Sequence, residues 1–416
     1  MPARRLAARW VIPVEGCPIE RGAVLIGAEG RVMAVGPDAM VPRPAEAVAE
    51  TYEHGLLLPG LINTHTHLEL TGLSGEAPEP DFAAWILGVR QLKAGRSPEA
   101  FLAAARAGLA ASYAAGVTTV ADTGDSGAVI RALAESGGSG VAYHEVFGPH
   151  PDQLAESLAG LQRQVESLEA FAVGRVRIGV SPHAPYTVSG PLYAAVAAWA
   201  GAEQLPLATH VAESWAESEL LARGEGAFAK AWRGRGIPLP APLGRTPVEW
   251  LDDHGVLSER TLCIHLVQAG TDDVSRLARA GAAVAHCPLS NRRHGHGAAP
   301  LAAFLEGRLC VGLGTDSVLS VGTPDLLSEA RAARCLAGLD AARTLALCTL
   351  EGARALGLDG ETGSLRVGKW GDCVVLRPRD GGAGLPPEEQ VLLSGPPDVL
   401  ATYVGGRDVY RADRPV

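Results

Sequence analysis

Short apolar runs alternate with longer amphipathic stretches through the middle of the chain. The runs are compact and rich in β-branched residues, which is typical of parallel strands buried on both faces. They cover residues 56–65, 116–123, 140–147, 176–182, 206–211, 261–267, 282–287 and 310–316. Between them, apolar positions at three- and four-residue spacing predict helices over 98–115, 152–170, 190–202, 272–280 and 324–337. This alternation predicts an α/β fold of the (β/α)8 TIM-barrel type, with a doubly wound sheet as the alternative.

The two ends of the chain have a different texture. GAVLIGAEGRVMAVG near the N-terminus and VLATYVGGRDVYR near the C-terminus alternate apolar with small or polar positions around glycine-rich turns. Such patterns predict short strands joined by tight turns. We expect residues 1–57 and 364–416 to pair into one small β-sandwich, and residues 58–363 to form the barrel.

Composition narrows the partners and the compartment. The net charge is −10 over 416 residues and no segment forms a basic stripe, so we expect no nucleic-acid partner. The N-terminal segment has no sustained apolar run and no apolar stretch is long enough to span a membrane, so we expect neither a secretory leader nor a membrane span. The seven cysteines are dispersed without a CxxC pair, which favours reduced thiols in a cytoplasmic protein.

The strongest chemical signal is the motif His65-Thr66-His67 at the end of the first apolar run. Residues two apart in a strand point to the same face, so both imidazoles can approach one metal ion. In a barrel, the carboxyl ends of all strands open onto one face, where active sites lie. Four further candidates end or follow other predicted strands, and we expect them to join the motif there: His183, His210, His265 and Asp316.

Metal-assisted hydrolysis needs a metal held by neutral imidazoles and a carboxylate, with a position left for water. The expected ligands are His65, His67, His210 and Asp316. Such a metal lowers the pKa of its water toward neutrality, so that hydroxide is available for attack. Glu213, three residues after His210, is our candidate proton shuttle. His265 could orient the hydroxide or polarise the substrate, and Asp316 is also counted as catalytic. The alternatives are a solvated charge at a helix start for Glu213 and a hydrogen-bonded core histidine for His265.

In chain order, the segments PGLINTHTHLEL, SPHAP, HVAES, CPLSN and GTDS resemble the motifs of the amidohydrolase superfamily, most of all its deaminase and chlorohydrolase branch. The resemblance implies a barrel with the metal ligands named above, Glu213 and His265 as acid/base and orienting groups, and His183 as a substrate contact. Binuclear members carry a bridging lysine at the end of strand four. The three lysines here are Lys93, Lys230 and Lys369, none at a predicted strand end, so we expect one divalent ion, Zn²⁺ or Fe²⁺.

Within that branch, HTHLEL, EVFG and SPHAPYTV look closest to the aminodeoxyfutalosine deaminases of menaquinone biosynthesis. The resemblance implies hydrolytic deamination of a purine-type amino heterocycle, 6-amino-6-deoxyfutalosine first, in which hydroxide attacks the amino-bearing carbon and ammonia leaves. It leaves open a deaminase of adenosine, S-adenosylhomocysteine or guanine, and a chlorohydrolase or deiminase. A ligand-binding barrel without turnover is the alternative from another class. The oligomeric state is also open, and a homodimer is compatible with the resemblance.

Aromatic and charged residues near the strand ends are candidate substrate contacts. Phe82 and Trp85 could stack on an aromatic ring, although both also suit the core of a helix. Arg292 could pair with a substrate carboxylate, and a solvated loop is the alternative. The motifs EVFG and CPLSN add Glu145 and Asn291 to this set.

Overall fold

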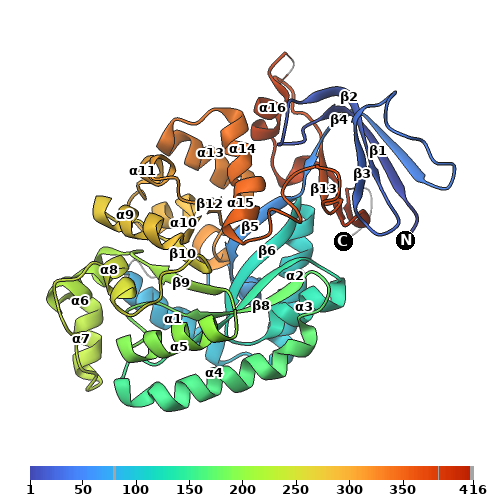
Figure 1. The fold of residues 1–416 in the computed structure, drawn as a ribbon. Coiled ribbons are helices and arrows are strands. Elements are labelled where there is room, and N and C mark those ends of the chain that lie inside the picture. Colours follow the sequence, from blue (N-terminus) through green and yellow to red (C-terminus); the bar gives the residue numbers. More distant parts are fainter. Residues whose placement is uncertain (78–80, 383, 413–416) are drawn as a thin grey trace.

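The computed structural model describes residues 1–77, 81–382 and 384–412 (Figure 1). Its centre is a sheet of eight parallel strands whose spatial order follows the sequence from β5 to β12. A bridge between Thr66 and Asp316, and backbone hydrogen bonds from Thr315 and Asp316 to the carbonyl of His65, connect the last strand to the first. This order confirms the predicted barrel and excludes a doubly wound sheet, in which the strand order reverses. The strands are β5 Leu61–Thr66, β6 Val117–Gly124, β7 Gly140–Val146, β8 Val176–Pro182, β9 Leu207–Val211, β10 Thr261–His265, β11 Ala283–His286 and β12 Val311–Leu313.

Helices connect the barrel strands and cover the outside of the barrel (Figure 1). The five helices predicted from periodicity are present as α2, α4, α5, α9 and α13. The helices are α1 Phe82–Ala94, α2 Pro98–Ala114, α3 Ala128–Ser136, α4 Leu154–Leu168, α5 Gly190–Ala202, α6 Trp215–Arg223, α7 Gly226–Gly234, α8 Pro247–Asp253, α9 Thr271–Ala280, α10 Pro288–Arg293, α11 Leu301–Glu306, α12 Val318–Val321, α13 Leu326–Ala337, α14 Ala341–Leu347, α15 Leu350–Ala355 and α16 Pro387–Leu393. Short 3₁₀ turns cover Leu68–Leu70, Pro151–Gln153, Glu169–Phe171 and Pro396–Asp398.

Both ends of the chain build one separate sheet, as expected, which lies to one side of the barrel (Figure 1). Its seven strands have the order β15-β14-β13-β4-β1-β2-β3. The central contact joins β4 and β13, which are antiparallel and come from opposite ends of the sequence. The strands are β1 Arg4–Val11, β2 Ile19–Ile26, β3 Val32–Pro37, β4 Val48–Pro59, β13 Cys373–Leu376, β14 Val399–Val404 and β15 Arg407–Arg411. The domain boundaries at 57/58 and 363/364 stay predictions.

The first predicted barrel strand, residues 56–65, is divided between the two sheets. Its first part is the end of β4, and only Leu61–Thr66 belongs to the barrel. The chain passes from one sheet to the other at Pro59 and Gly60. A side chain at position 60 would collide with Thr118, since a Cβ there would lie 2.1 Å from its Oγ1. The apolar run was continuous because both sheets bury their strands at this junction.

In the described part of the chain, no helix combines the length and the apolar run needed to cross a bilayer. The cysteines are all unpaired thiols. Four of them are buried, whereas Cys17 and Cys335 are exposed.

Candidate active site

The carboxyl ends of β5 and β12 are fastened to each other, which brings the HxH motif and Asp316 together. The side chain of Asn63 donates to Thr315 Oγ1 at 2.9 Å and accepts from the Thr315 backbone N–H at 3.1 Å. Gly314 packs directly on His65, where a Cβ would lie 2.7 Å from that of the histidine. The two segments are 250 residues apart in sequence, and this close packing makes them neighbours at the rim.

Hydrogen bonds at Nδ1 fix the orientation of the His67 and His210 rings. Nδ1 of His67 lies 2.8 Å from the backbone oxygen of Thr123, and Nδ1 of His210 lies 3.1 Å from that of His183. A carbonyl oxygen only accepts, so Nδ1 carries the proton in each ring and Nε2 keeps its lone pair. Burial lowers the pKa of His67 to about 3 and holds that of His210 well below its usual value. Both imidazoles are therefore neutral, the form that binds metals.

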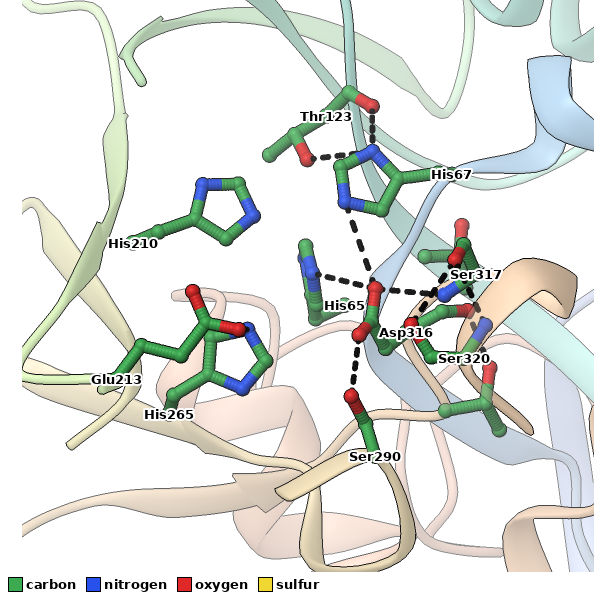
Figure 2. Close-up of polar contacts among 12 residues, drawn as sticks. His65, His67, Thr123, His210, Glu213, His265, Ser290, Asp316, Ser317 and Ser320 are labelled. Carbon is green, nitrogen blue, oxygen red and sulfur yellow. Dashed lines mark hydrogen bonds and ion pairs between the residues drawn. The ribbon is translucent and has the colours of Figure 1, made fainter. Parts of the chain in front are cut away.

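Three of the expected ligands, His65, His67 and Asp316, place potential ligand atoms close enough together for one metal ion, and His210 lies beside His65 (Figure 2). Asp316 Oδ1 lies 3.6 Å from Nε2 of His65 and 3.5 Å from Nε2 of His67. Two ligands of one tetrahedral ion, each about 2.1 Å from it, would be about 3.4 Å apart. Among the described residues, neither ring nitrogen of the buried His65 has a hydrogen-bond partner, as expected of a side chain that awaits a ligand. Potential ligand atoms lie within 4.8 Å of one another in the sets His65–His67–Asp316 and His65–His210–His265.

Asp316 is held by neighbours on both sides (Figure 2). Ser290 donates its hydroxyl to Oδ2 at 2.5 Å, and the backbone N–H of Ser317 donates to Oδ1 at 2.6 Å. The backbone of Asp316 has φ 58°, and that of His265 has φ 75°. This left-handed conformation is unfavourable for both residues, and such strain is often stored at functional sites.

Glu213 follows β9, and its carboxyl group faces the histidines (Figure 2). Its Oε1 lies 3.6 Å from Nε2 of His265, and the Tyr186 hydroxyl lies 3.5 Å from its Oε2. Burial, reinforced by the negative charges of Asp316 and Glu217, raises the pKa of Glu213 well above its usual value. A raised pKa favours the protonated form of the carboxyl group, which can donate a proton.

The turn that carries Glu213 is fixed by a residue that the sequence analysis missed. Glu217 accepts hydrogen bonds from the backbone N–H of Ala212 at 2.8 Å and of Glu213 at 2.9 Å. Ser214 caps the following helix by accepting from the N–H of Glu217. The spacing Ser-x-x-Glu at the start of α6 is a helix N-terminus signature and could have revealed this role.

His265 ends β10, and its ring is oriented by Asn291. Nδ1 lies 2.9 Å from Asn291 Oδ1, which leaves Nε2 of His265 directed at Glu213. The Asn291 Nδ2 atom is buried and has no partner among the described residues. Asn291, expected as a substrate contact, thus lies beside the site with its amide oxygen engaged by His265.

The expected polar substrate contacts Glu145 and His183 lie next to His210. Ligand atoms of the three residues fall within 4.8 Å of one another. Burial raises the pKa of Glu145 to about 8, even though the charge of Lys93 opposes this, and its Oε1 has no hydrogen-bond partner among the described residues. Nδ1 of His183 lies 2.8 Å from the Thr187 hydroxyl, within hydrogen-bond distance. Arg292, in contrast, is exposed on α10.

The two aromatic candidates on α1 differ in environment. The Phe82 and Trp85 rings stack with centroids 5.7 Å apart. Trp85 is buried in a cluster with Leu70 and Leu319, as the helix-core alternative expects. Phe82 directs its ring toward Tyr186 and His296, so it is the nearer of the two to Glu213.

The sequence analysis did not recognise the structural role of Lys93, a half-buried lysine at the end of α1. Lys93 Nζ lies 2.6 Å from Glu69 Oε1 and 2.6 Å from Asp125 Oδ1. It connects α1 to the segments that follow β5 and β6. As expected, none of the three lysines lies at the end of a barrel strand, and β8 ends at Pro182.

A parallel barrel with imidazoles and a carboxylate at its rim is an arrangement typical of metal-dependent hydrolases. The chain belongs to the amidohydrolase family, whose sequence pattern matches residues 56–409. It is 34% identical over 366 residues to the aminodeoxyfutalosine deaminase of Deinococcus radiodurans, covering 84% of each chain. It is 30% identical to the 5′-deoxyadenosine deaminase of Methanothermobacter thermautotrophicus, over 94% of this chain and 90% of that one. The structure of an adenosine deaminase from Xanthomonas campestris with bound zinc superposes with a TM-score of 0.82 at 25% identity, covering 97% and 92% of the two chains. The protein is a hydrolase that acts on C–N bonds.

Proposed function

We propose that the protein is a metal-dependent deaminase of adenine-type nucleosides, with 6-amino-6-deoxyfutalosine the first candidate substrate. The observation that carries the proposal is the position of Glu213, a buried carboxyl group whose pKa is raised, 3.6 Å from His265 and close to the negative charge of Asp316. The relatives named above deaminate aminodeoxyfutalosine and 5′-deoxyadenosine, which supports the same reaction here.

His65, His67, His210 and Asp316 would hold one divalent ion, Zn²⁺ or Fe²⁺. The chemistry that such an ion supplies is the activation of water as a nucleophile near neutral pH. The residue supporting this assignment is His65, whose two ring nitrogens are buried and have no hydrogen-bond partner within the described chain.

Glu213 is the proton carrier of the proposed reaction. Its carboxyl proton passes to the ring nitrogen next to the amino-bearing carbon, which makes that carbon susceptible to addition of hydroxide. Glu213 recovers a proton from the attacking water and passes it to the amino group. The C–N bond then breaks, ammonia leaves, and the hydroxyl proton of the adduct returns to Glu213 as the carbonyl group forms at that carbon.

His265 positions the reacting groups. Because Asn291 holds the Nδ1 proton, Nε2 is a hydrogen-bond acceptor on the side of Glu213. A neutral imidazole there can orient the nucleophile without competing for the proton of Glu213.

The test is ammonia release from a panel of nucleosides by the protein loaded separately with Zn²⁺ and Fe²⁺. The panel contains 6-amino-6-deoxyfutalosine, 5′-deoxyadenosine, 5′-methylthioadenosine, S-adenosylhomocysteine and adenosine. We expect release from at least one member, abolished by a chelator. The Glu213→Gln protein should bind metal as the wild type does and lose about a hundredfold in kcat. No release from any member by the loaded wild type would refute the proposal.

A further inference from the structure

A loop beyond α10 brings two histidines over the Glu213 side of the site. His294 and His296 stack loosely on each other, with ring centroids 5.4 Å apart. Each ring also meets an aromatic residue of α1: His294 is 4.5 Å from Trp85, and His296 is 4.5 Å from Phe82. These edge-on contacts hold the loop against α1.

The polar atoms of the two histidines have different surroundings. Nε2 of His294 lies 3.1 Å from the Ser320 hydroxyl, within hydrogen-bond distance. The His296 side chain is only 5% exposed, and its Nε2 is buried without a hydrogen-bond partner in the described part of the chain. A buried polar atom without a partner is costly, so its retention points to a ligand.

The unpartnered nitrogen faces the proposed proton carrier. His296 Nε2 lies 3.7 Å from Glu213 Oε1, and His265 Nε2 lies 3.6 Å from the same oxygen. Both separations exceed hydrogen-bond length, so the atoms lie close to one another without being bonded, and a ligand group beside them could contact both. We call the unbonded space beside Glu213 Oε1 and His296 Nε2 the gap. The two imidazoles flank Oε1 from different sides: His265 contacts His65 and His210, whereas His296 contacts Phe82.

We propose that His296 is a further substrate-binding residue, which donates or accepts one hydrogen bond at the polar heterocycle edge that Glu213 also contacts. The inference rests on the proposed function, because it takes the ligand of this gap to be the amino heterocycle. The proposal also gives a role to the contact between His296 and Phe82, because that contact fixes the ring with Nε2 directed toward Glu213. A second metal ion is not supported here, since neither His294 nor His296 belongs to a group of potential ligands found among the described residues.

Three variants separate the hydrogen bond from packing. His296→Phe keeps an aromatic ring against Phe82 but removes the polar atom. His296→Gln places an amide group near the position of Nε2 without the ring. His294→Phe is the matched control, because it alters the neighbouring ring and leaves the atom facing Glu213 in place.

The experiment uses the metal-loaded full chain and the panel nucleoside that the wild type deaminates fastest. For His296→Phe we expect kcat/KM to fall about tenfold, the loss of one neutral hydrogen bond, with partial recovery in His296→Gln. His294→Phe should stay within about twofold of the wild type, because it removes no hydrogen bond to the substrate. In the slow Glu213→Gln background, calorimetry should show the same nucleoside binding about tenfold more weakly when His296→Phe is added.

Several results would overturn the inference: wild-type kinetics for His296→Phe, equal losses in the His296→Phe and His294→Phe proteins, or no recovery in His296→Gln. If thermal melting shows that His296→Phe is poorly folded, His296→Ala takes its place under the same criteria. A wild type inactive on the whole panel would remove the proposed function together with this inference. If the wild type is active and the His296→Phe protein has the same kinetics, the inference about His296 is refuted and the proposed function stands.

Discussion

Asn291 Oδ1 lies 2.9 Å from Nδ1 of His265, and this contact decides which nitrogen of His265 faces Glu213. Both side chains are buried, so the choice of tautomer is made by the protein and not by solvent. We expect Asn291→Ala to lower kcat about tenfold or more, since losing the group that orients a site histidine commonly has such an effect. Steady-state kinetics would measure the change, with metal content as the check on the site. Asn291→Asp keeps an acceptor and should retain more activity, and an Asn291→Ala enzyme at the wild-type rate would contradict the assigned tautomer.

Asp316 is expected to control metal binding. Removing a ligand should weaken binding more than removing a residue behind it, so Asp316→Ala should lower metal affinity by more than about a hundredfold and Ser290→Ala by about tenfold. Metal per chain after dialysis against a buffered chelator would measure both. Ser320→Ala is the matched control, because Ser320 contacts Ser317 and His294 and not the carboxylate. Full metal content in the Asp316→Ala protein would mean that the ion is held elsewhere.

Lys93 is expected to stabilise the fold through its ion pairs with the buried Glu69 and with Asp125. Lys93→Met would leave Glu69 as a buried carboxylate without its partner, which commonly costs about 3 kcal/mol. Urea unfolding at neutral pH would measure the loss. Lys230→Met, on the exposed face of α7, should change the unfolding free energy by less than about 0.5 kcal/mol. Equal effects of the two substitutions would show that the Lys93 pairs contribute nothing.

The sheet built by the chain ends should lose stability in acid. Glu50 on β4 pairs with Arg4 and Arg411. Burial alone would raise the pKa of Glu50, but the hydrogen bond and charge of Arg411 and the charge of Arg4 outweigh burial and hold the pKa below 4.5. A carboxyl group with a lowered pKa in the folded state stabilises the protein above its unfolded pKa, and this contribution is lost as the pH falls through the folded value.

Glu50→Gln should therefore be less stable than the wild type by about 1 kcal/mol at pH 7, and the difference should shrink below about pH 4.5. Urea unfolding of both proteins at several pH values would test this. Glu53→Gln, an exposed position on the same strand, is the control. If the stability difference between the wild type and Glu50→Gln grows as the pH falls, the pKa of Glu50 is not lowered in the folded state and the prediction is wrong.

The sequence predicted best what depends on regular alternation. Barrel strands end at one face, so the positions of His65, His210, His265 and Asp316 followed from strand order. The capping residue Glu217 was within reach of sequence reasoning through its Ser-x-x-Glu spacing. The positions of Lys93 and His296 were not within reach of sequence reasoning. Lys93 lies at a helix end and His296 in a loop, and the path of both segments is set by packing that leaves no periodic pattern in the sequence. The junction at Pro59 was missed because two different sheets bury one continuous apolar run.

The order of strands in the end sheet has a consequence for synthesis on the ribosome. β4 emerges early, yet its antiparallel neighbour β13 follows more than 300 residues later. During that interval one edge of β4 offers free backbone groups to other chains. A nascent chain arrested before Cys373 should thus depend on chaperones more than one released whole, which crosslinking of arrested chains can measure.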